Sequence, residues 1–137
     1  MHRHCFADSW SEESFRALME GQGVFGFLAK SAAAAEWQSF ALARAVTEDA
    51  EIFTLATLPE ARRTGLGFAI LGAVIEQAKR LGAACLFLEV DARNEAALRL
   101  YDRAGFLVTG RRYGYYSVPS GEPADALTLS VKLLPGP

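Results

Sequence analysis

The chain has 137 residues, of which 51% are apolar, so it has the size of one domain and can bury a core. Its 14 basic and 16 acidic residues are mixed along the sequence, which leaves no broad basic surface for nucleic acid or for an anionic membrane. No apolar run approaches the roughly 18 to 20 residues that cross a bilayer. We therefore expect a single domain over residues 1–137 with no nucleic-acid partner and no membrane partner.

The two cysteines, Cys5 and Cys85, lack the spacing of a disulfide framework or of a zinc site. Because disulfides accumulate in oxidising compartments, this usage favours a cytoplasmic protein without a structural metal. His2 and His4 have a spacing that could chelate a metal, but a mobile terminus is the favoured interpretation. Residues 1–5 are not followed by the apolar segment of a signal peptide.

The first half of the chain predicts a helix followed by three antiparallel strands. Ser9 and Glu12 have the spacing of a capping box, and the helix would run over residues 13–20 until the glycines that follow it. Three apolar stretches of strand length come next, with short turn segments between them. These stretches cover residues 24–30, 37–46 and 50–58.

The second half of the chain alternates helices and strands. From Gly65 to Leu81 the apolar residues recur at helical spacing, and Asn94 can cap a second helix that Gly105 ends. Three further strands are predicted over residues 84–90, 106–112 and 126–133. The expected architecture is an α/β fold, α+β in some classifications, in which helices flank one mixed sheet.

A turn with two arginines and two glycines precedes the first of these helices. It reads Arg62-Arg63-Thr64-Gly65-Leu66-Gly67. The amides at a helix N-terminus favour an anion, glycine lets the backbone approach it, and arginine adds a planar set of donors. A plain helix start with solvated arginines is the alternative. The turn lacks the lysine of a P-loop, and Ile70 stands where a dinucleotide-binding fingerprint requires glycine or alanine.

Two further residues are candidates for acid–base chemistry. Glu89 lies at the end of the apolar strand over residues 84–90, where a carboxylate can act as a general base. The alternatives for Glu89 are a solvated position and an ion pair with Arg93. Tyr101 lies on the apolar face of the second helix, where an ordinary core tyrosine is the alternative.

These motifs, in this order along the chain, resemble those of the GNAT superfamily of acetyltransferases. Residues 62–67 are similar to the Arg/Gln-x-x-Gly-x-Gly/Ala motif that holds the pyrophosphate of coenzyme A in that family. Residues 88–106 are similar to the family segment that reads Leu-Glu-Val, then Asn, then Leu-Tyr, then Gly-Phe. The resemblance implies acetyl-CoA as co-substrate without a metal, Glu89 as general base and Tyr101 as general acid. It also implies the following cofactor contacts: Leu55, Ala56, Thr57, Arg62, Arg63, Thr64, Gly65, Leu66, Gly67, Phe68, Asn94 and Tyr101.

Three segments resemble the branch of bacterial enzymes that acetylate the N-terminal alanine of a ribosomal protein. They are Ser9-Trp10-Ser11-Glu12, residues 48–53, and Arg111-Arg112-Tyr113-Gly114-Tyr115-Tyr116. The N-terminal peptide of a ribosomal protein is therefore the expected acceptor. A small amine, a lysine side chain and a non-catalytic acetyl-CoA-binding module are the alternatives. The tyrosines either line an acceptor groove or cover the sheet, and stacking on RNA fits the acidic chain least well.

The chain begins later than this resemblance implies. Relatives start with an extra strand and helix before the Trp-Ser-Glu point, whereas only residues 1–9 lead to it here. We expect a GNAT fold that lacks its first strand-helix unit, unless the start is trimmed or wrongly assigned. Loss of that unit would expose a sheet edge, through which a homodimer could form.

Overall fold

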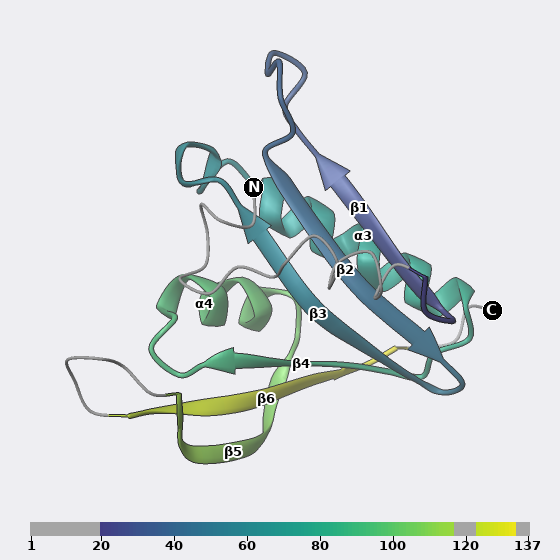
Figure 1. Ribbon diagram of the computed structural model, residues 1–137, viewed down its shortest axis with the longest axis vertical. Coiled ribbons are helices and arrows are strands. Elements are labelled where there is room, and N and C mark those ends of the chain that lie inside the picture. The colour runs from purple at the N-terminus through teal and green to yellow at the C-terminus, as the bar shows by residue number, and fades with distance from the viewer. Residues whose placement is uncertain (1–19, 117–122, 134–137) are drawn as a thin grey trace.

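The computed structural model describes residues 20–116 and 123–133. The helix expected over residues 13–20, apart from Glu20, lies outside these ranges, as do Cys5, His2 and His4. The described elements are β1 (Val24–Ala29), β2 (Ser39–Val46), β3 (Asp49–Thr57), the 3-10 turn η1 (Pro59–Ala61), α3 (Leu66–Arg80), β4 (Cys85–Asp91), α4 (Glu95–Arg103), β5 (Leu107–Tyr116) and β6 (Ala124–Lys132) (Figure 1). Neither α3 nor α4 is long and apolar enough to cross a membrane.

The strands form one mixed sheet in the order β1-β2-β3-β4-β6-β5. β1 pairs antiparallel with β2, and β2 pairs antiparallel with β3, as the short connections between these strands predict. β3 and β4 are parallel, because α3 carries the chain back along the sheet between them. β6 then lies antiparallel between β4 and β5. The expectation of a mixed sheet flanked by helices is confirmed, and β1 and β5 are the edges of the described sheet.

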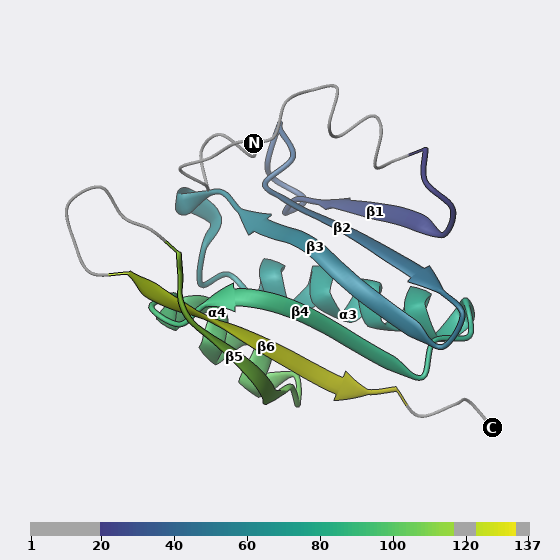
Figure 2. The same cartoon turned by 60° about the horizontal axis from the view of Figure 1, so that its bottom comes forward.

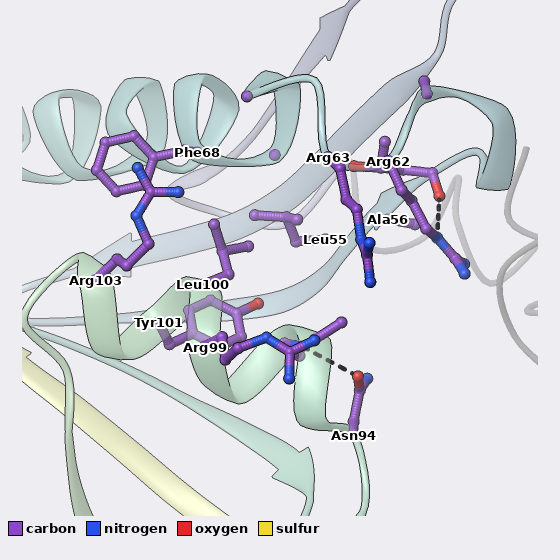
Figure 3. Close-up of a pocket in the computed structure, with 16 residues that line it drawn as sticks. Leu55, Ala56, Arg62, Arg63, Phe68, Asn94, Arg99, Leu100, Tyr101 and Arg103 are labelled. Atoms are coloured by element: carbon purple, nitrogen blue, oxygen red, sulfur yellow. Dashed lines mark hydrogen bonds between the residues drawn. The ribbon is translucent and has the colours of Figure 1, made fainter.

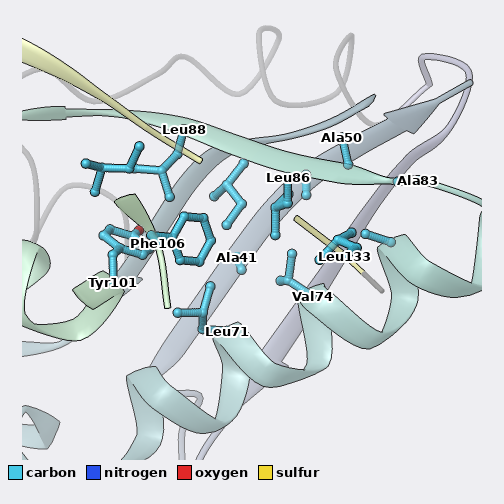
Figure 4. Close-up of a cluster of buried hydrophobic side chains, with 14 of the residues drawn as sticks. Ala41, Ala50, Leu71, Val74, Ala83, Leu86, Leu88, Tyr101, Phe106 and Leu133 are labelled. Atoms are coloured by element: carbon cyan, nitrogen blue, oxygen red, sulfur yellow. The ribbon is translucent and has the colours of Figure 1, made fainter. Parts of the chain in front are cut away.

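Both helices pack against one face of this sheet (Figure 2). On α3 the buried residues recur at helical spacing, and Leu71 and Val74 have no exposed area. They meet Leu86 of β4, which is equally buried, and Tyr101 and Phe106 close the same cluster (Figure 4). Truncating a leucine in such a core to alanine costs about 2–5 kcal/mol. This packing fixes α3 and α4 on the same side of the sheet.

A β-bulge interrupts β3 at Phe53. Thr54 pairs with Leu42 and Ile52 pairs with Ala43, so Phe53 is one residue more than β2 can match. An extra residue reverses which face of the sheet the following side chains meet. Before the bulge, Ile52 belongs to the core beneath the helices; after it, the side chain that packs against that core is Leu55.

The bulge coincides with the point at which β3 separates from β4. The last parallel pair is Ile52 with Leu88, whereas β3 remains paired with β2 to Thr57 and β4 remains paired with β6 to Asp91. The two strands therefore diverge beyond this pair (Figure 1). The end of β3 has no strand neighbour on its β4 side among the described residues.

β5 extends four residues beyond the predicted end at Arg112. The cause is a second irregularity, in which the β5–β6 register shifts between Arg112 and Tyr116. Gly114 adopts a positive φ of 63° there, and its amide donates to Asp125 Oδ1 over 2.8 Å. The glycine thus bends the strand without ending it, because β6 supplies a partner for its amide.

Candidate active site

A cavity of about 1010 Å³ lies beside the diverging end of β3, bounded by the turn before α3 and by α4 (Figure 3). Its volume is at the upper end of the roughly 300–1,000 Å³ that is usual for ligand sites. The lining residues are Leu55, Ala56, Thr57, Ala61, Arg62, Arg63, Gly65, Gly67, Phe68, Asn94, Ala96, Ala97, Arg99, Leu100, Tyr101 and Arg103.

The turn that opens the cavity presents a row of unbonded amides. Arg63 and Gly65 have positive φ values of 64° and 86°, and Gly65 is the N-cap of α3. In the described ranges, no group accepts a hydrogen bond from the backbone amides of residues 63–68. Two arginine side chains stand beside these donors, so the turn has the donor set that a phosphate oxygen requires.

Gly67 keeps the cavity open between β3 and α4. A Cβ at this position would lie 3.5 Å from Thr57 Oγ1 and 3.6 Å from Leu100 Cδ2. Both distances are ordinary contacts, so a side chain here would pack into the cavity without disturbing the helix. The glycine therefore leaves a narrow passage from the anion-binding turn to the place where the strands diverge.

The backbone amide and carbonyl of Leu55 face the cavity. The Leu58 amide donates to the Gln38 carbonyl of β2 over 2.8 Å, and backbone groups alternate in direction along a strand. The Ala56 carbonyl accordingly lies toward β2, where it accepts from Ser39 Oγ over 2.9 Å. The amide and carbonyl of Leu55 point away from β2, so they can pair with an extended ligand.

Tyr101 forms part of the cavity wall and of the core at once. Only 6% of the residue is exposed, and its ring packs edge-on against Phe106 with 5.3 Å between ring centroids. Burial raises the pKa of Tyr101 to about 12, so the phenol keeps its proton at neutral pH. Figure 3 shows the side chain extending from α4 into the lined space. The hydroxyl at this position therefore carries a proton at neutral pH.

Asn94 has two roles that the sequence suggested separately. Its Oδ1 accepts from the Ala97 amide over 3.1 Å, which makes it the N-cap of α4. The same residue lines the cavity. Since the cap uses the oxygen, the side-chain NH₂ group can serve a ligand.

Glu89 lies on the opposite face of the sheet from Tyr101. Its neighbours Leu88 and Val90 are buried beneath the helices, and side chains alternate along a strand. Arg112 Nη2 lies 3.3 Å from Glu89 Oε2, whereas Arg93 pairs with Asp91. The alternative interpretation, in which Glu89 pairs with Arg93, is therefore wrong, because the Arg93 side chain turns back toward Asp91 at the end of β4.

Glu89 is also the first residue of β4 beyond its last pair with β3, so it stands where the two strands begin to diverge. A second carboxylate, Glu51 of β3, lies on the same face, opposite Arg44 in the β2–β3 register. The pKa of Glu51 is raised, first by burial and then by the charge of Glu89, while Arg44 lowers it. We call these four residues, Arg44, Glu51, Glu89 and Arg112, the charged face.

Most of the predicted cofactor residues lie on the cavity wall, but Thr64 and Leu66 do not. The Thr64 hydroxyl donates to the Ala61 carbonyl over 2.6 Å, so this side chain shapes the turn and does not line the cavity. Sequence reasoning missed Ala61 and several α4 residues, namely Ala96, Ala97, Arg99, Leu100 and Arg103. Ala97 lies three residues after Asn94 and four before Tyr101, and this helical spacing is the signal that could have found it.

Comparisons with known proteins agree with this geometry. Residues 1–106 match the acetyltransferase (GNAT) family. The chain is 33% identical over 133 residues to the [ribosomal protein bS18]-alanine N-acetyltransferase of Escherichia coli, which covers 97% of this chain and 87% of that protein. It is 31% identical over 111 residues to N-alpha-acetyltransferase 30 of Schizosaccharomyces pombe, covering 81% and 68%.

Solved structures show the same fold. The ribosomal-protein-S18-alanine N-acetyltransferase from Escherichia coli superposes with a TM-score of 0.85 at 31% identity, over 96% of this chain and 83% of that one. Arabidopsis thaliana NAA60, solved in complex with acetyl-CoA, superposes with a TM-score of 0.80 at 20% identity, over 96% and 89%. The chain therefore belongs to the GNAT family and is an N-acetyltransferase.

Proposed function

We propose that this acetyltransferase transfers the acetyl group of acetyl-CoA to the N-terminal α-amine of a ribosomal protein that begins with alanine. One observation carries the proposal. A cavity suited to coenzyme A on the helix side of the sheet ends where β3 and β4 diverge, and Tyr101 and Glu89 stand on opposite faces at that point.

The cavity residues fit coenzyme A group by group. The free amides of residues 63–68, with Arg62 and Arg63, would bind the pyrophosphate. The backbone of Leu55 would pair with the amides of the pantetheine arm, and Gly67 leaves room for it. Asn94 adds a donor at the far wall. When bound, acetyl-CoA supplies an activated acetyl group as a thioester.

The two faces divide the proton transfers. An α-amine has a pKa of about 8, so much of it is protonated at neutral pH. The protonated amine must lose a proton before its nitrogen can attack the thioester carbon. Glu89 accepts that proton, directly or through one water. The C–S bond breaks as the C–N bond forms, and the Tyr101 hydroxyl donates a proton to the departing sulfur.

Two features support the acceptor: the first favours an amine, and the second favours the α-amine of a peptide. Glu51 and Glu89 give the charged face two carboxylates, which suit a cationic amine, and Tyr115 lies beside Arg112 with 5.0 Å from its guanidinium carbon to the ring centroid. The 33% identical relative is named for transfer to the alanine of bS18. A lysine side chain or a small amine is the second candidate acceptor, since neither carboxylate distinguishes these amines by charge.

The test is mass spectrometry of acetyl transfer to three peptides. The first begins with the alanine of a ribosomal N-terminus, the second is blocked at that amine and carries a lysine, and the third carries neither amine. We expect one acetyl group on the α-amine of the first peptide. Glu89→Gln should slow it by about 10² to 10⁴ without changing acetyl-CoA affinity.

Glu76→Gln on the exposed side of α3 is the matched control and should leave the rate unchanged. Transfer to the lysine peptide alone would move the assignment to a side-chain acetyltransferase. Binding of acetyl-CoA without transfer to any amine would support the non-catalytic module.

A further inference from the structure

Thr54 of β3 carries a buried hydroxyl that the proposed reaction does not use. Only 7% of the residue is exposed, and its Oγ1 is shielded from solvent. Across residues 20–116 and 123–133, it is the one buried side-chain oxygen or nitrogen with no hydrogen-bond partner. Buried hydroxyls nearly always have a partner in folded proteins, because an unpaired one has lost its bonds to water without replacement. The Thr54 hydroxyl therefore lacks a partner that a ligand could supply.

The register of β2 and β3 places Thr54 on the side of the sheet that carries the charged face. Thr54 pairs with Leu42. Ala41 and Ala43, on either side of Leu42, belong to the core beneath the helices. Side chains alternate along a strand, and directly paired residues share a face of the sheet. Thr54 therefore points away from the helices, toward the side on which Glu89 stands.

Thr54 also lies at the point where β3 and β4 diverge. The last pair between the two strands joins Ile52 to Leu88. Glu51 and Thr54 lie within two residues of this pair along β3, and Glu89 is the next residue along β4. The charge of Glu89 raises the pKa of Glu51, so the two carboxylates are close enough to interact. Two carboxylates and one hydroxyl, all able to accept hydrogen bonds, thus border the divergence on one side of the sheet.

We propose that the Thr54 hydroxyl is the third hydrogen-bond acceptor for the amine of the acceptor substrate, and that it makes the enzyme select primary amines. This inference rests on the proposed transfer to an amine. A primary ammonium group carries three N–H donors, which match the carboxylates of Glu51 and Glu89 and the hydroxyl of Thr54. When Glu89 takes one proton, two N–H groups stay bonded to Glu51 and Thr54. The nitrogen lone pair is then left to attack the thioester carbon.

The selectivity follows from the unequal strengths of the three hydrogen bonds. Those to the two carboxylates join opposite charges, whereas the acceptor at Thr54 is neutral and its bond is weaker. A secondary amine has one N–H donor fewer, so Thr54 is the group that it leaves unpaired. A primary amine gains the bond to Thr54 without removing water from the hydroxyl, because the hydroxyl is already shielded from solvent.

The test compares Thr54→Val with the wild-type protein on two peptides that differ only in their first residue, alanine or N-methylalanine. Valine keeps the shape of the side chain and removes the hydroxyl. We expect kcat/KM for the alanine peptide to fall roughly 10- to 100-fold, since a hydrogen bond to a charged group is lost. For the N-methylalanine peptide it should change by less than about threefold, which reduces the preference for a primary amine. Acetyl-CoA affinity should stay unchanged.

Thermal unfolding of the free protein gives a readout that a structural role for the hydroxyl would not produce. Thr54→Val should raise the melting temperature by a few degrees, because the variant no longer buries an unpaired hydroxyl. Thr54→Ser keeps the hydroxyl and should retain kcat/KM within about threefold of the wild-type value. Thr109→Val is the matched control, since Thr109 is exposed on β5 and its hydroxyl is already paired with Ser130 Oγ at 2.8 Å. It should leave kcat/KM for both peptides unchanged.

Three results would overturn the inference. An unchanged kcat/KM in Thr54→Val would show that the hydroxyl does not touch the acceptor, and an equal loss for both peptides would show that it does not bind the third N–H. A lowered melting temperature would assign the hydroxyl to a structural contact. If the wild-type protein acetylates only lysine side chains, lysine and N-methyllysine peptides take the place of the two alanine peptides. Absence of transfer to any amine would overturn the proposed function, and this inference with it.

Discussion

The two faces of the sheet differ in the kind of polar group that they offer. The core on the helix face is apolar, and the donors at the cavity beside it are backbone amides and arginine side chains. The charged face instead carries the carboxylates of Glu51 and Glu89, and burial raises the pKa of Glu51. A fixed positive potential suits phosphate binding, whereas proton transfer requires groups that titrate.

In the proposed reaction, the divergence of β3 and β4 is what lets groups on the two faces act on the same substrates. A continuous sheet would keep a ligand on the helix face away from Glu89. The extra residue at Phe53 ends the pairing at Ile52 and turns Leu55 toward the cavity. The comparison therefore predicts that substitutions on one face change donor binding or proton donation, and that substitutions on the other change acceptor activation.

The largest expected effect on the helix face is that of Tyr101→Phe. We expect kcat to fall by about 100-fold or more, since the variant loses the hydroxyl that we propose as the proton donor to the sulfur. The KM for acetyl-CoA should stay within about twofold, because the ring and its packing on Phe106 are retained. Single-turnover kinetics would measure the chemical step. Tyr113→Phe, at a side chain that is 81% exposed on β5, is the control, and an unchanged rate for Tyr101→Phe would assign the donor role elsewhere.

A smaller effect on the same face is expected from Gly67→Ala. The added methyl would stand against Thr57 and Leu100 in the passage, so affinity for acetyl-CoA should fall by about 10-fold. Gly72→Ala is the same substitution on the same helix, at a position where an added Cβ meets nothing within 4 Å. Each variant should gain about 0.5–1 kcal/mol of stability from helix propensity, measured by chemical denaturation. Equal cofactor affinities in the two variants would show that the passage is not the pantetheine path.

The sequence predicted the features that depend on local pattern. The apolar period of residues 66–80 predicted α3, and Asn94 was predicted as the cap of α4; both are confirmed. The arginine and glycine turn predicted an anion site, which stays a prediction. Each of these signals lies within one turn or one helix, so neighbouring residues suffice to recognise it.

Features that depend on register between distant segments were not predictable. The bulge at Phe53 is defined only by its pairing with β2, and the extension of β5 past Gly114 depends on Asp125 of β6. The α4 arginines become cavity residues only because α3 and α4 pack on one face of the sheet. Sequence could name Glu89 and Tyr101, but placing them on opposite faces required the structure.

Arg112→Gln tests the charged face with a modest expected effect. Arg112 is paired with Glu89 but exposed, so the pair contributes at most about 1 kcal/mol. We expect kcat/KM for the peptide to fall by up to about fivefold, with acetyl-CoA affinity unchanged. Arg111→Gln breaks the pair with Asp125 on the other side of β5 and is the matched control. A loss of cofactor affinity in Arg112→Gln would mean that the two faces are not functionally separate.

The smallest expected effect is that of the Glu51 carboxyl on the pH dependence of the free energy of unfolding. The pKa of Glu51 in the folded protein is raised above its ordinary value of 4.5. Between pH 4.5 and this raised pKa, the folded protein keeps the Glu51 proton, whereas the unfolded chain has released it. Stability therefore falls as the pH rises through that window, and the loss persists at neutral pH. Glu51→Gln should increase the free energy of unfolding near pH 7, by less than about 1 kcal/mol for this half-exposed group. The gain should become much smaller near pH 4, where the carboxyl is mostly protonated in both states.

Arg44→Gln should change stability in the direction opposite to Glu51→Gln, and it completes this test. Arg44 lowers the pKa of Glu51, so its removal should increase the pH-dependent loss of stability that Glu51→Gln removes. Chemical denaturation at the two pH values measures both variants. If Glu51→Gln lowers stability equally at both, the Glu51 side chain acts through a contact and not through its charge. The charged face would then not owe its character to repulsion between two carboxylates.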